Sequence, residues 1–572
     1  MVKTVRRQWS IYLFIIGMLS LVPGLAGFTY VPSVHAASVK VSRHHQNADN
    51  VYWPQSQALP RFATPQHLDV VDLQPATGDM RLMMSTLQGI VNRQRPSIYL
   101  VEHARDEGPY TWLNEAHLAY QVHKDPWEVV KKYAQATKGV IIYDPNLLDT
   151  INVATTEAGI ANGIVASPTL AQKLTAAPYN LPVLDDLRGK FNNALDAYNW
   201  EFQNLWPKTT HRMLVGISPT TSETITSSDN GGASYGGIPY GCLRDYAVAN
   251  RAFVFWLTAD ENVDSDQVSL FNQILSSVQP GTPYLGWFDK ERPGVRLASR
   301  HGVYVLAADW FSNLTVWSGV RASSQPIKTI AAPALRNKVY VTFVVSDGDN
   351  LQYSEHYMRT LWDDPSRGKV PLNWSINPLL IDAAPFLLNH YQTTAGNDDL
   401  LVSAPSGAGY FYPSLWPQDN LSTYLQQSNS YLRRMGTNIV YAIDKNAELP
   451  EYVAQAYAQT NLQGMFLNTT DYHSTLTTAS GNLPISTQLH ASTDTGIVQA
   501  IHQQAAQWDR QSPLFITVSL IAWKTTPADA VYVAQHLNSH YKVVRGDQFF
   551  QLIHEANAAP VSAGRLSPRR AK

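Results

Sequence analysis

The stretch Val339–Tyr353, with the sequence VYVTFVVSDGDNLQY, decides the fold of the C-terminal half of this chain. Its first seven residues are all β-branched or aromatic. An apolar run that ends in turn-forming residues is typical of a strand buried on both faces, and such strands belong to parallel sheets covered by helices. Asp347, Asp349 and Asn350 then leave the strand together, at the end where α/β proteins place their chemistry. The alternative is an Asp-Gly turn in which Asp349 or Asn350 caps the next helix.

Strand and helix patterns alternate closely from this stretch to the C-terminus. About eight βα units fit into some 220 residues, which is the usual size of a (β/α)8 barrel. An open, doubly wound sheet is the alternative fold. The expected strands are Val339–Val345, Leu372–Ile376, Leu400–Ala404, Asn438–Ile443, Gly464–Asn468, Ile485–Leu489, Leu514–Ile521 and Tyr541–Val544.

The preceding half also alternates between strands and helices, so we expect an N-terminal α/β domain before a C-terminal TIM-like barrel. Long helices are predicted over Leu184–Trp206 and Leu243–Leu257. The predicted organisation is a signal peptide at residues 1–36, an extended lead-in at 37–67, the α/β domain at 68–320, a linker at 321–338, the barrel at 339–556 and a disordered basic tail at 557–572.

The N-terminus has the features of a secretory signal. A basic segment with Lys3, Arg6 and Arg7 precedes the apolar stretch Ile11–Leu25, and Val34-His35-Ala36 offers small residues for cleavage. We therefore expect a secreted or extracellular protein, or one anchored at the cell surface if the segment is retained. The rest of the chain lacks a run of about 20 apolar residues, so no stable membrane insertion is expected after cleavage.

Composition favours an uncharged, hydroxyl-rich partner. Charged residues make up 15% of the chain, below the usual ~25%, while the chain holds 15 Trp and 29 Tyr. The formal net charge is −2, and several of the basic residues lie in the leader and the tail. The remaining, mildly acidic part argues against nucleic acid as a partner. A large core rich in Trp and Tyr would give the same composition.

Cofactor and metal signals are absent from the sequence. The Gly- and Ser-rich stretch Ser227–Cys242 lacks the glycine spacing that cradles phosphates. The single cysteine, Cys242, has no Cys or His beside it at a metal-ligand spacing, and we expect it to be buried. We expect no cofactor and no metal.

Polar and aromatic residues recur after the predicted barrel strands. Paired carboxylates serve glycoside hydrolysis as acid and as base or nucleophile, while aromatic faces stack on sugars. Taken singly, each of these residues also suits a helix cap or turn. The candidate catalytic residues are Asp347, Asp349, Asp444 and Asp471, and the candidate substrate-binding residues are Asn350, Tyr410, Tyr412, Trp416, His473 and Trp523.

The segment after the third barrel strand is the most specific motif. Gly407, Gly409, Tyr410, Tyr412 and Pro413 spell GxGYxYP, and the chain resembles the family of glycoside hydrolases named for this motif. The N-terminal half is similar to the same family at 86–93 (TLQGIVNR) and 96–100 (PSIYL), as is the DGDN sequence at 347–350. The resemblance covers about residues 68–555 and implies carbohydrate processing. It assigns no catalytic residues.

Two alternatives to a secreted glycoside hydrolase remain. A strand ending in SDGD is similar to the metal-binding strand of polysaccharide deacetylases, although the only His-x-x-x-His spacing nearby, His536 and His540, comes too late in the chain. The second alternative is a glycan-binding surface protein without catalytic activity. Convergent carboxylates favour the hydrolase, and an Asp-His-His cluster favours the deacetylase.

Overall fold

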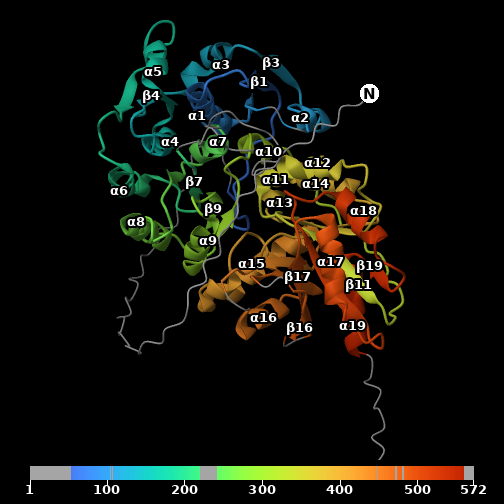
Figure 1. The fold of residues 1–572 in the computed structure, drawn as a ribbon. Helices are drawn as coiled ribbons and strands as arrows, with labels where there is room; N and C mark the ends of the chain where they lie inside the picture. The colour runs from blue at the N-terminus through green and yellow to red at the C-terminus, as the bar shows by residue number, and fades with distance from the viewer. Residues whose placement is uncertain are drawn as a thin grey trace, which may run out of the picture. The chain divides into compact units, whose positions relative to one another are not determined.

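The computed structural model describes residues 53–103, 105, 107–219, 241–446, 449–470, 473–479 and 482–558 (Figure 1). The predicted signal peptide, most of the lead-in, most of the Ser227–Cys242 stretch and most of the basic tail lie outside these residues. Among the helices that the structure describes, none has the length and apolar character needed to span a membrane.

The N-terminal region contains three small parallel sheets. In the first, with order β2-β1-β3, the elements are β1 (Leu68–Asp72), α1 (Gly78–Gln94), β2 (Ile98–Val101), α2 (Thr111–Glu115), β3 (Tyr120–His123), α3 (Pro126–Tyr133) and η1 (Ala134–Ala136). In the second, with order β5-β4-β6, they are β4 (Gly139–Ile142), α4 (Thr150–Ala161), β5 (Gly163–Ala166), α5 (Pro168–Thr175), β6 (Val183–Asp186), α6 (Ala194–Asn204) and η2 (Trp206–Lys208).

The third sheet has the order β10-β9-β7-β8 and leads to the linker. Its elements are β7 (Leu214–Gly216), α7 (Arg244–Ala249), β8 (Phe253–Phe255), α8 (Ser265–Ser276), β9 (Pro283–Gly286), α9 (Glu291–Arg300), β10 (Tyr304–Leu306) and α10 (Leu314–Trp317). Residues 321–338 contain neither helix nor strand.

Two predicted N-terminal helices are wrong in part. The segment 184–206 begins as strand β6, and α6 starts only after Asn193, whose side chain accepts a hydrogen bond from the Asp196 amide. The segment 243–257 is helical only as far as α7. Arg251 adopts a left-handed conformation with φ of +52°, which turns the chain into strand β8. A side-chain cap in the first segment and a left-handed backbone conformation in the second therefore override the apolar helical spacing.

The C-terminal half is a closed parallel barrel of seven strands. Its strands are β11 (Val339–Val345), β12 (Leu372–Ile376), β13 (Asp399–Ser403), β14 (Ile439–Ile443), β15 (Gly464–Asn468), β17 (Leu483–His490) and β18 (Leu514–Leu520), with β16 (Leu476–Ala479) antiparallel to β17. The helices are α11 (Leu351–Glu355), α12 (Tyr357–Trp362), α13 (Leu380–Ala383), α14 (Pro385–Thr394), η4 (Pro413–Leu415), α15 (Gln418–Met435), α16 (Glu451–Ala458), α17 (Asp494–Gln504), α18 (Pro527–Gln535) and α19 (Gly546–Ala558).

All eight predicted strands form, but the eightfold barrel does not close as expected. The eighth strand, β19 (Tyr541–Val543), pairs only with residues 339–341 of β11. Beyond it, Val344 and Val345 of β11 pair directly with β12. At this fork the buried Asn373 donates to Thr342 Oγ1 at 2.8 Å and to the Phe343 carbonyl at 2.7 Å. The barrel therefore has seven strands at its carboxyl-terminal mouth.

The third sheet joins this mouth through backbone pairing. Val305 of β10 forms an antiparallel bridge with Tyr410, and Ala307 forms a parallel bridge with Asn350. These contacts bring helix α9, which precedes β10, to the end of the barrel where β11 terminates.

Candidate active site

The DGDN sequence forms a tight turn between β11 and α11. Asp347 has φ of +72°, a conformation that non-glycine residues adopt rarely and that clusters at functional sites. A Cβ atom at Gly348 would lie 2.1 Å from the Ser375 backbone, so only glycine fits against β12. The Asn350 side chain accepts a hydrogen bond from the Tyr353 amide at 2.8 Å and caps α11. Asn350 is therefore the residue that caps α11, and the carboxyl groups of Asp347 and Asp349 are not used for that cap.

The two carboxylates have different surroundings. Asp347 is half-buried and accepts hydrogen bonds from the Ser346 hydroxyl and, at 2.9 Å, from Trp523 Nε1. Asp349 is 7% exposed. Burial raises the pKa of both groups, but the hydrogen bonds from Ser346 and Trp523 offset part of the rise at Asp347. For Asp349, the negative charges of Asp347 and Glu291 add to burial, so its pKa lies well above the usual range.

Glu291 brings a third carboxylate from outside the barrel. It is the first residue of α9, in the N-terminal region, and its Oε1 accepts a hydrogen bond from the Tyr410 hydroxyl at 2.7 Å. Its charge raises the pKa of Asp347 and of Asp349. The sequence prediction missed this residue. Locally, Glu291 resembles an ordinary acidic residue in the first turn of a helix, and only the fold brings it to the barrel mouth.

The GxGYxYP motif holds the third sheet to the barrel. Tyr410 and Tyr412 are 1% and 0% exposed, so their rings are core residues, with only the Tyr410 hydroxyl directed to an acid of the site. The Tyr412 amide donates to Ser299 Oγ of α9 at 2.9 Å. A Cβ atom at Gly409 would lie 2.2 Å from the Tyr304 ring. The structure thus places both predicted sugar-binding tyrosines inside a domain joint.

Two other predicted site residues, Asp444 and Trp416, are buried in structural contacts. Asp444 is fully buried, and its two oxygens accept from the Ser414 amide at 2.8 Å and the Ser414 hydroxyl at 3.0 Å, which fixes the motif loop. Trp416 is 2% exposed and stacks on Tyr424 with ring centroids 4.3 Å apart. His473 is exposed, and its carbonyl accepts from Thr487. Asp471 lies outside the described residues.

Trp523 does lie at the mouth, as predicted. Besides its bond to Asp347, its ring is stacked on Tyr357 with centroids 5.3 Å apart and planes 9° apart. Both rings are half-buried, so they retain some accessible surface beside the carboxylates. Such a surface can stack on the apolar face of a sugar.

A basic group accompanies the acids. Lys445, directly after Asp444 at the end of β14, donates to Asn468 Oδ1 and to the Thr469 carbonyl. Burial lowers its pKa to about 8; the nearby Arg292 lowers it too, while Glu291 opposes the shift. Burial and the charge of Lys445 lower the pKa of His490, which ends β17, to about 4. The mouth therefore combines three acids with a lysine and a neutral histidine.

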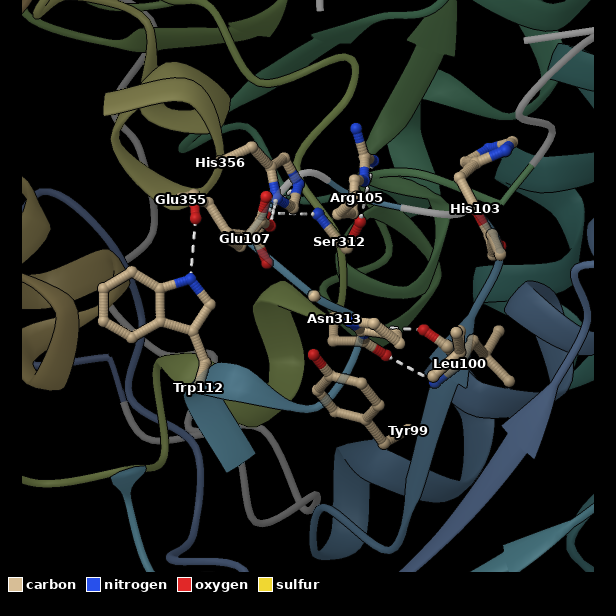
Figure 2. Close-up of a pocket in the computed structure, with 14 residues that line it drawn as sticks. Tyr99, Leu100, His103, Arg105, Glu107, Trp112, Ser312, Asn313, Glu355 and His356 are labelled. Atoms are coloured by element: carbon tan, nitrogen blue, oxygen red, sulfur yellow. Dashed lines mark hydrogen bonds and ion pairs between the residues drawn. The ribbon is translucent and has the colours of Figure 1, made fainter. Parts of the chain in front are cut away.

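A small polar pocket lies between the first sheet and α11 (Figure 2). It has a cavity volume of about 20 Å³, enough for one water molecule. His356 contacts two carboxylates there, with Nδ1 2.6 Å from Glu107 Oε1 and Nε2 2.9 Å from Glu355 Oε2. The Ser312 amide also donates to Glu355 Oε2, at 2.8 Å. None of these residues was predicted as a site residue.

Four domain models of one family match the chain. The model described as "GxGYxYP putative glycoside hydrolase C-terminal domain" matches residues 337–554, and the models for the first, second and third N-terminal domains match residues 67–135, 137–209 and 235–319. No curated protein matches the sequence significantly.

Among solved structures, the chain is similar to a protein described as a putative hydrolase from Bacteroides thetaiotaomicron VPI-5482. The TM-score is 0.75 at 22% identity, over 88% of this chain and 98% of that one, which establishes a shared fold. A protein described as a putative polysaccharide deacetylase from Mycobacterium smegmatis matches 42% of this chain and all of its own at 11% identity, but its TM-score of 0.29 carries no argument.

Proposed function

This chain belongs to the GxGYxYP family, and from that premise we propose that it hydrolyses a glycosidic bond at the barrel mouth. In this proposal Asp349 donates the proton to the leaving oxygen. Asp347 is the carboxylate that acts as nucleophile or base. Glu291 and the Tyr410 hydroxyl complete the polar wall of the site.

The observation that carries the proposal is that two neighbouring carboxyl groups have different surroundings, which give them unequal proton affinities. Burial and the charges of Asp347 and Glu291 keep Asp349 protonated to higher pH. Hydrogen bonds from Ser346 and Trp523 favour the ionised form of Asp347. Glycoside hydrolysis requires this division between a protonated acid and an ionised partner.

The aromatic surface at the mouth supports a carbohydrate substrate. The stacked pair Trp523–Tyr357 lies directly beside Asp347, because the Trp523 indole nitrogen bonds to that carboxylate. A sugar ring on this face would have its polar edge near the acids. The low charge of the chain agrees with an uncharged polyol. We propose an extracellular site of action, on the strength of the leader-like sequence alone.

The deacetylase reading is disfavoured by the position of its histidines. The His540 carbonyl accepts a hydrogen bond from the amide of Val339, the first residue of β11, whereas Asp347 lies two residues after the last residue of that strand. The seven residues of β11 separate the end of the strand near His540 from the end near Asp347, a distance of roughly 20 Å. His536 lies on the same side as His540, just after α18. These histidines are thus at the opposite end of the barrel from the carboxylates.

The proposal is tested by screening the purified chain against a panel of polysaccharides and oligosaccharides for release of reducing ends. Asp349→Asn and Asp347→Asn should each lower turnover by about 10²- to 10⁴-fold while the fold is kept. Asp509→Asn, which changes an exposed aspartate in the turn before β18, is the matched control and should retain full turnover. Unchanged turnover in both active-site variants, or a folded chain that cleaves none of the panel, would contradict the proposal.

A further inference from the structure

Three side chains far apart in the sequence meet beside the small pocket. Glu102 and His103 follow β2 directly, and Cys242 lies two residues before α7. Their ligand atoms all lie within 4.8 Å of one another, and Cys242 Sγ is 3.4 Å from Glu102 Oε2. The residues are 6%, 7% and 2% exposed. Within the described part of the chain, this is the one group of three or more such side chains whose ligand atoms all lie this close to one another.

We propose that Glu102, His103 and Cys242 bind one divalent cation of the zinc type. Thiolate, imidazole and carboxylate are the ligands that zinc takes in proteins, and a thiolate disfavours Mg²⁺ and Ca²⁺. Tetrahedral bonds of about 2.3 Å to sulfur and about 2.0 Å to oxygen place the two ligand atoms about 3.5 Å apart. The observed separation of 3.4 Å between Cys242 Sγ and Glu102 Oε2 matches this geometry.

The backbone is shaped around the carboxylate of this group. A Cβ atom at position 241 would lie 1.4 Å from Glu102 Oε1, so any larger residue than Gly241 would displace the carboxylate from its present position. Two ligand side chains, Glu102 and His103, also line the water-sized cavity. Three protein ligands with space for one water give the coordination of an open zinc site.

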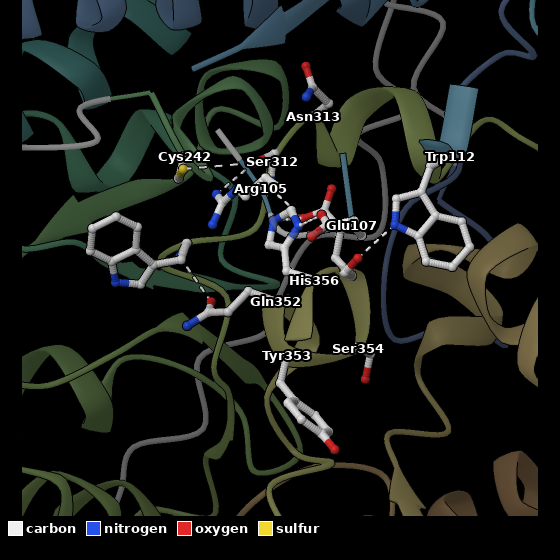
Figure 3. A network of polar contacts seen from close by, with 12 residues as sticks. Arg105, Glu107, Trp112, Cys242, Ser312, Asn313, Gln352, Tyr353, Ser354 and His356 are labelled. Carbon is white, nitrogen blue, oxygen red and sulfur yellow. Dashed lines mark hydrogen bonds and ion pairs between the residues drawn. The ribbon is translucent and has the colours of Figure 1, made fainter. Parts of the chain in front are cut away.

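Ser312 connects the cation site to the barrel (Figure 3). Its Oγ lies 4.0 Å from Cys242 Sγ and accepts a hydrogen bond from Arg105 at 3.3 Å. Its amide donates to Glu355 at the end of α11, the helix that begins at the DGDN turn. A bound cation would therefore tie the first sheet, α7 and the turn that carries Asp347 and Asp349 into one unit. The proposal does not depend on the reaction at the barrel mouth.

This site was not predictable from the amino-acid pattern, because Glu102 and Cys242 lie 140 residues apart. Cys242 is buried, as predicted, but the expectation that no metal ligand lies near it applied only to its neighbours in the sequence.

The test is metal binding by the full purified chain. After treatment with a chelator, the chain is reloaded with Zn²⁺ or Co²⁺, freed of excess metal, and its metal content is measured by mass spectrometry. We expect one equivalent, and with Co²⁺ a thiolate-to-metal charge-transfer band. Cys242→Ser should remove this band and weaken Zn²⁺ binding by more than the roughly 10- to 100-fold that loss of a supporting outer contact costs.

Matched variants keep the test decisive. His103→Ala should lose the metal, whereas His536→Ala, which removes an exposed histidine, should keep it. Thermal unfolding gives a second readout, because a ligand that binds the folded chain raises its midpoint. Zn²⁺ should raise the midpoint of the parent and leave that of Cys242→Ser unchanged. A parent chain that holds less than about a tenth of an equivalent, or a Cys242→Ser variant with the same affinity and the same band, overturns the proposal.

Discussion

Replacing Gly409 with alanine tests whether the GxGYxYP motif acts as a domain joint. Gly409 has φ of +147°, which an L-residue adopts only with strain of about 1–3 kcal/mol. The added Cβ would lie 2.2 Å from Tyr304 Cδ2 and 2.9 Å from Tyr304 Cγ. The Tyr304 ring and the Gly409 backbone are both buried, and overpacking of this kind costs about 1–3 kcal/mol. We therefore expect Gly409→Ala to lower the free energy of unfolding by about 2–6 kcal/mol.

The assay is urea unfolding followed by tryptophan fluorescence, with Gly368→Ala as the matched control. Gly368 also has a positive φ, of +79°, but a Cβ atom there would meet nothing within 4 Å. The control therefore carries the backbone strain without the overlap. Adding Tyr304→Ala to Gly409→Ala should recover part of the loss, because the two residues are in contact and their effects should couple by about 0.5–3 kcal/mol.

The reasoning would be refuted if Gly409→Ala and Gly368→Ala lowered the free energy of unfolding equally. It would also be refuted if the loss in the Gly409→Ala/Tyr304→Ala double variant equalled the sum of the losses in the two single variants. A functional consequence accompanies the structural one. Since the joint places Glu291 at the barrel mouth, Gly409→Ala should also reduce turnover on any substrate that the parent cleaves.

Three further predictions concern the mouth. Asp349→Asn should unfold at a higher temperature than the parent at neutral pH and at the same temperature below about pH 4. A raised pKa lets Asp349 contribute stability only at low pH, and this contribution is lost as the pH rises through that pKa; parallel melting curves across the pH range would contradict this. Trp523→Phe removes a hydrogen bond to a carboxylate, worth about 1.5–3 kcal/mol, and should raise the pKa of Asp347, so the acidic limb of the rate–pH profile moves to higher pH. An unmoved limb would mean that Asp347 does not control it. Lys445→Met should raise the pKa of His490 from about 4, which an NMR titration of that imidazole would measure, and an unchanged titration would show that the lysine charge does not reach it.

The sequence predicted the barrel strands well, because each is a short apolar run bounded by turn residues. It could not predict how the barrel closes. Closure depends on where β19 stops pairing with β11, and the residues of Tyr541–Val543 do not show where that pairing ends. The predicted helix over 243–257 was too long for a related reason. A single left-handed residue, Arg251, ends α7, and arginine carries no turn signal.

The site was predictable where chemistry and strand ends coincide, as at Asp347 and Asp349. It was not predictable where a distant segment contributes, as with Glu291. Tyr410 and Tyr412 suggested sugar stacking because aromatic residues at a strand end serve both binding and packing. Their burial against the third sheet decides for packing, and burial depends on the tertiary fold.

The length of β19 has a consequence for the carboxylates. The barrel wall has eight strands at its base and seven at its mouth, so the wall narrows along its axis. This narrowing lets β11 meet β12 and presses the Gly348 backbone against Ser375. The crowding of acids at the mouth thus depends on a strand that ends before reaching it. Two additional residues in β19 would lie between β11 and β12 and would push these strands apart. We expect this to separate Asp347 and Asp349 from Glu291 without changing any of the three residues.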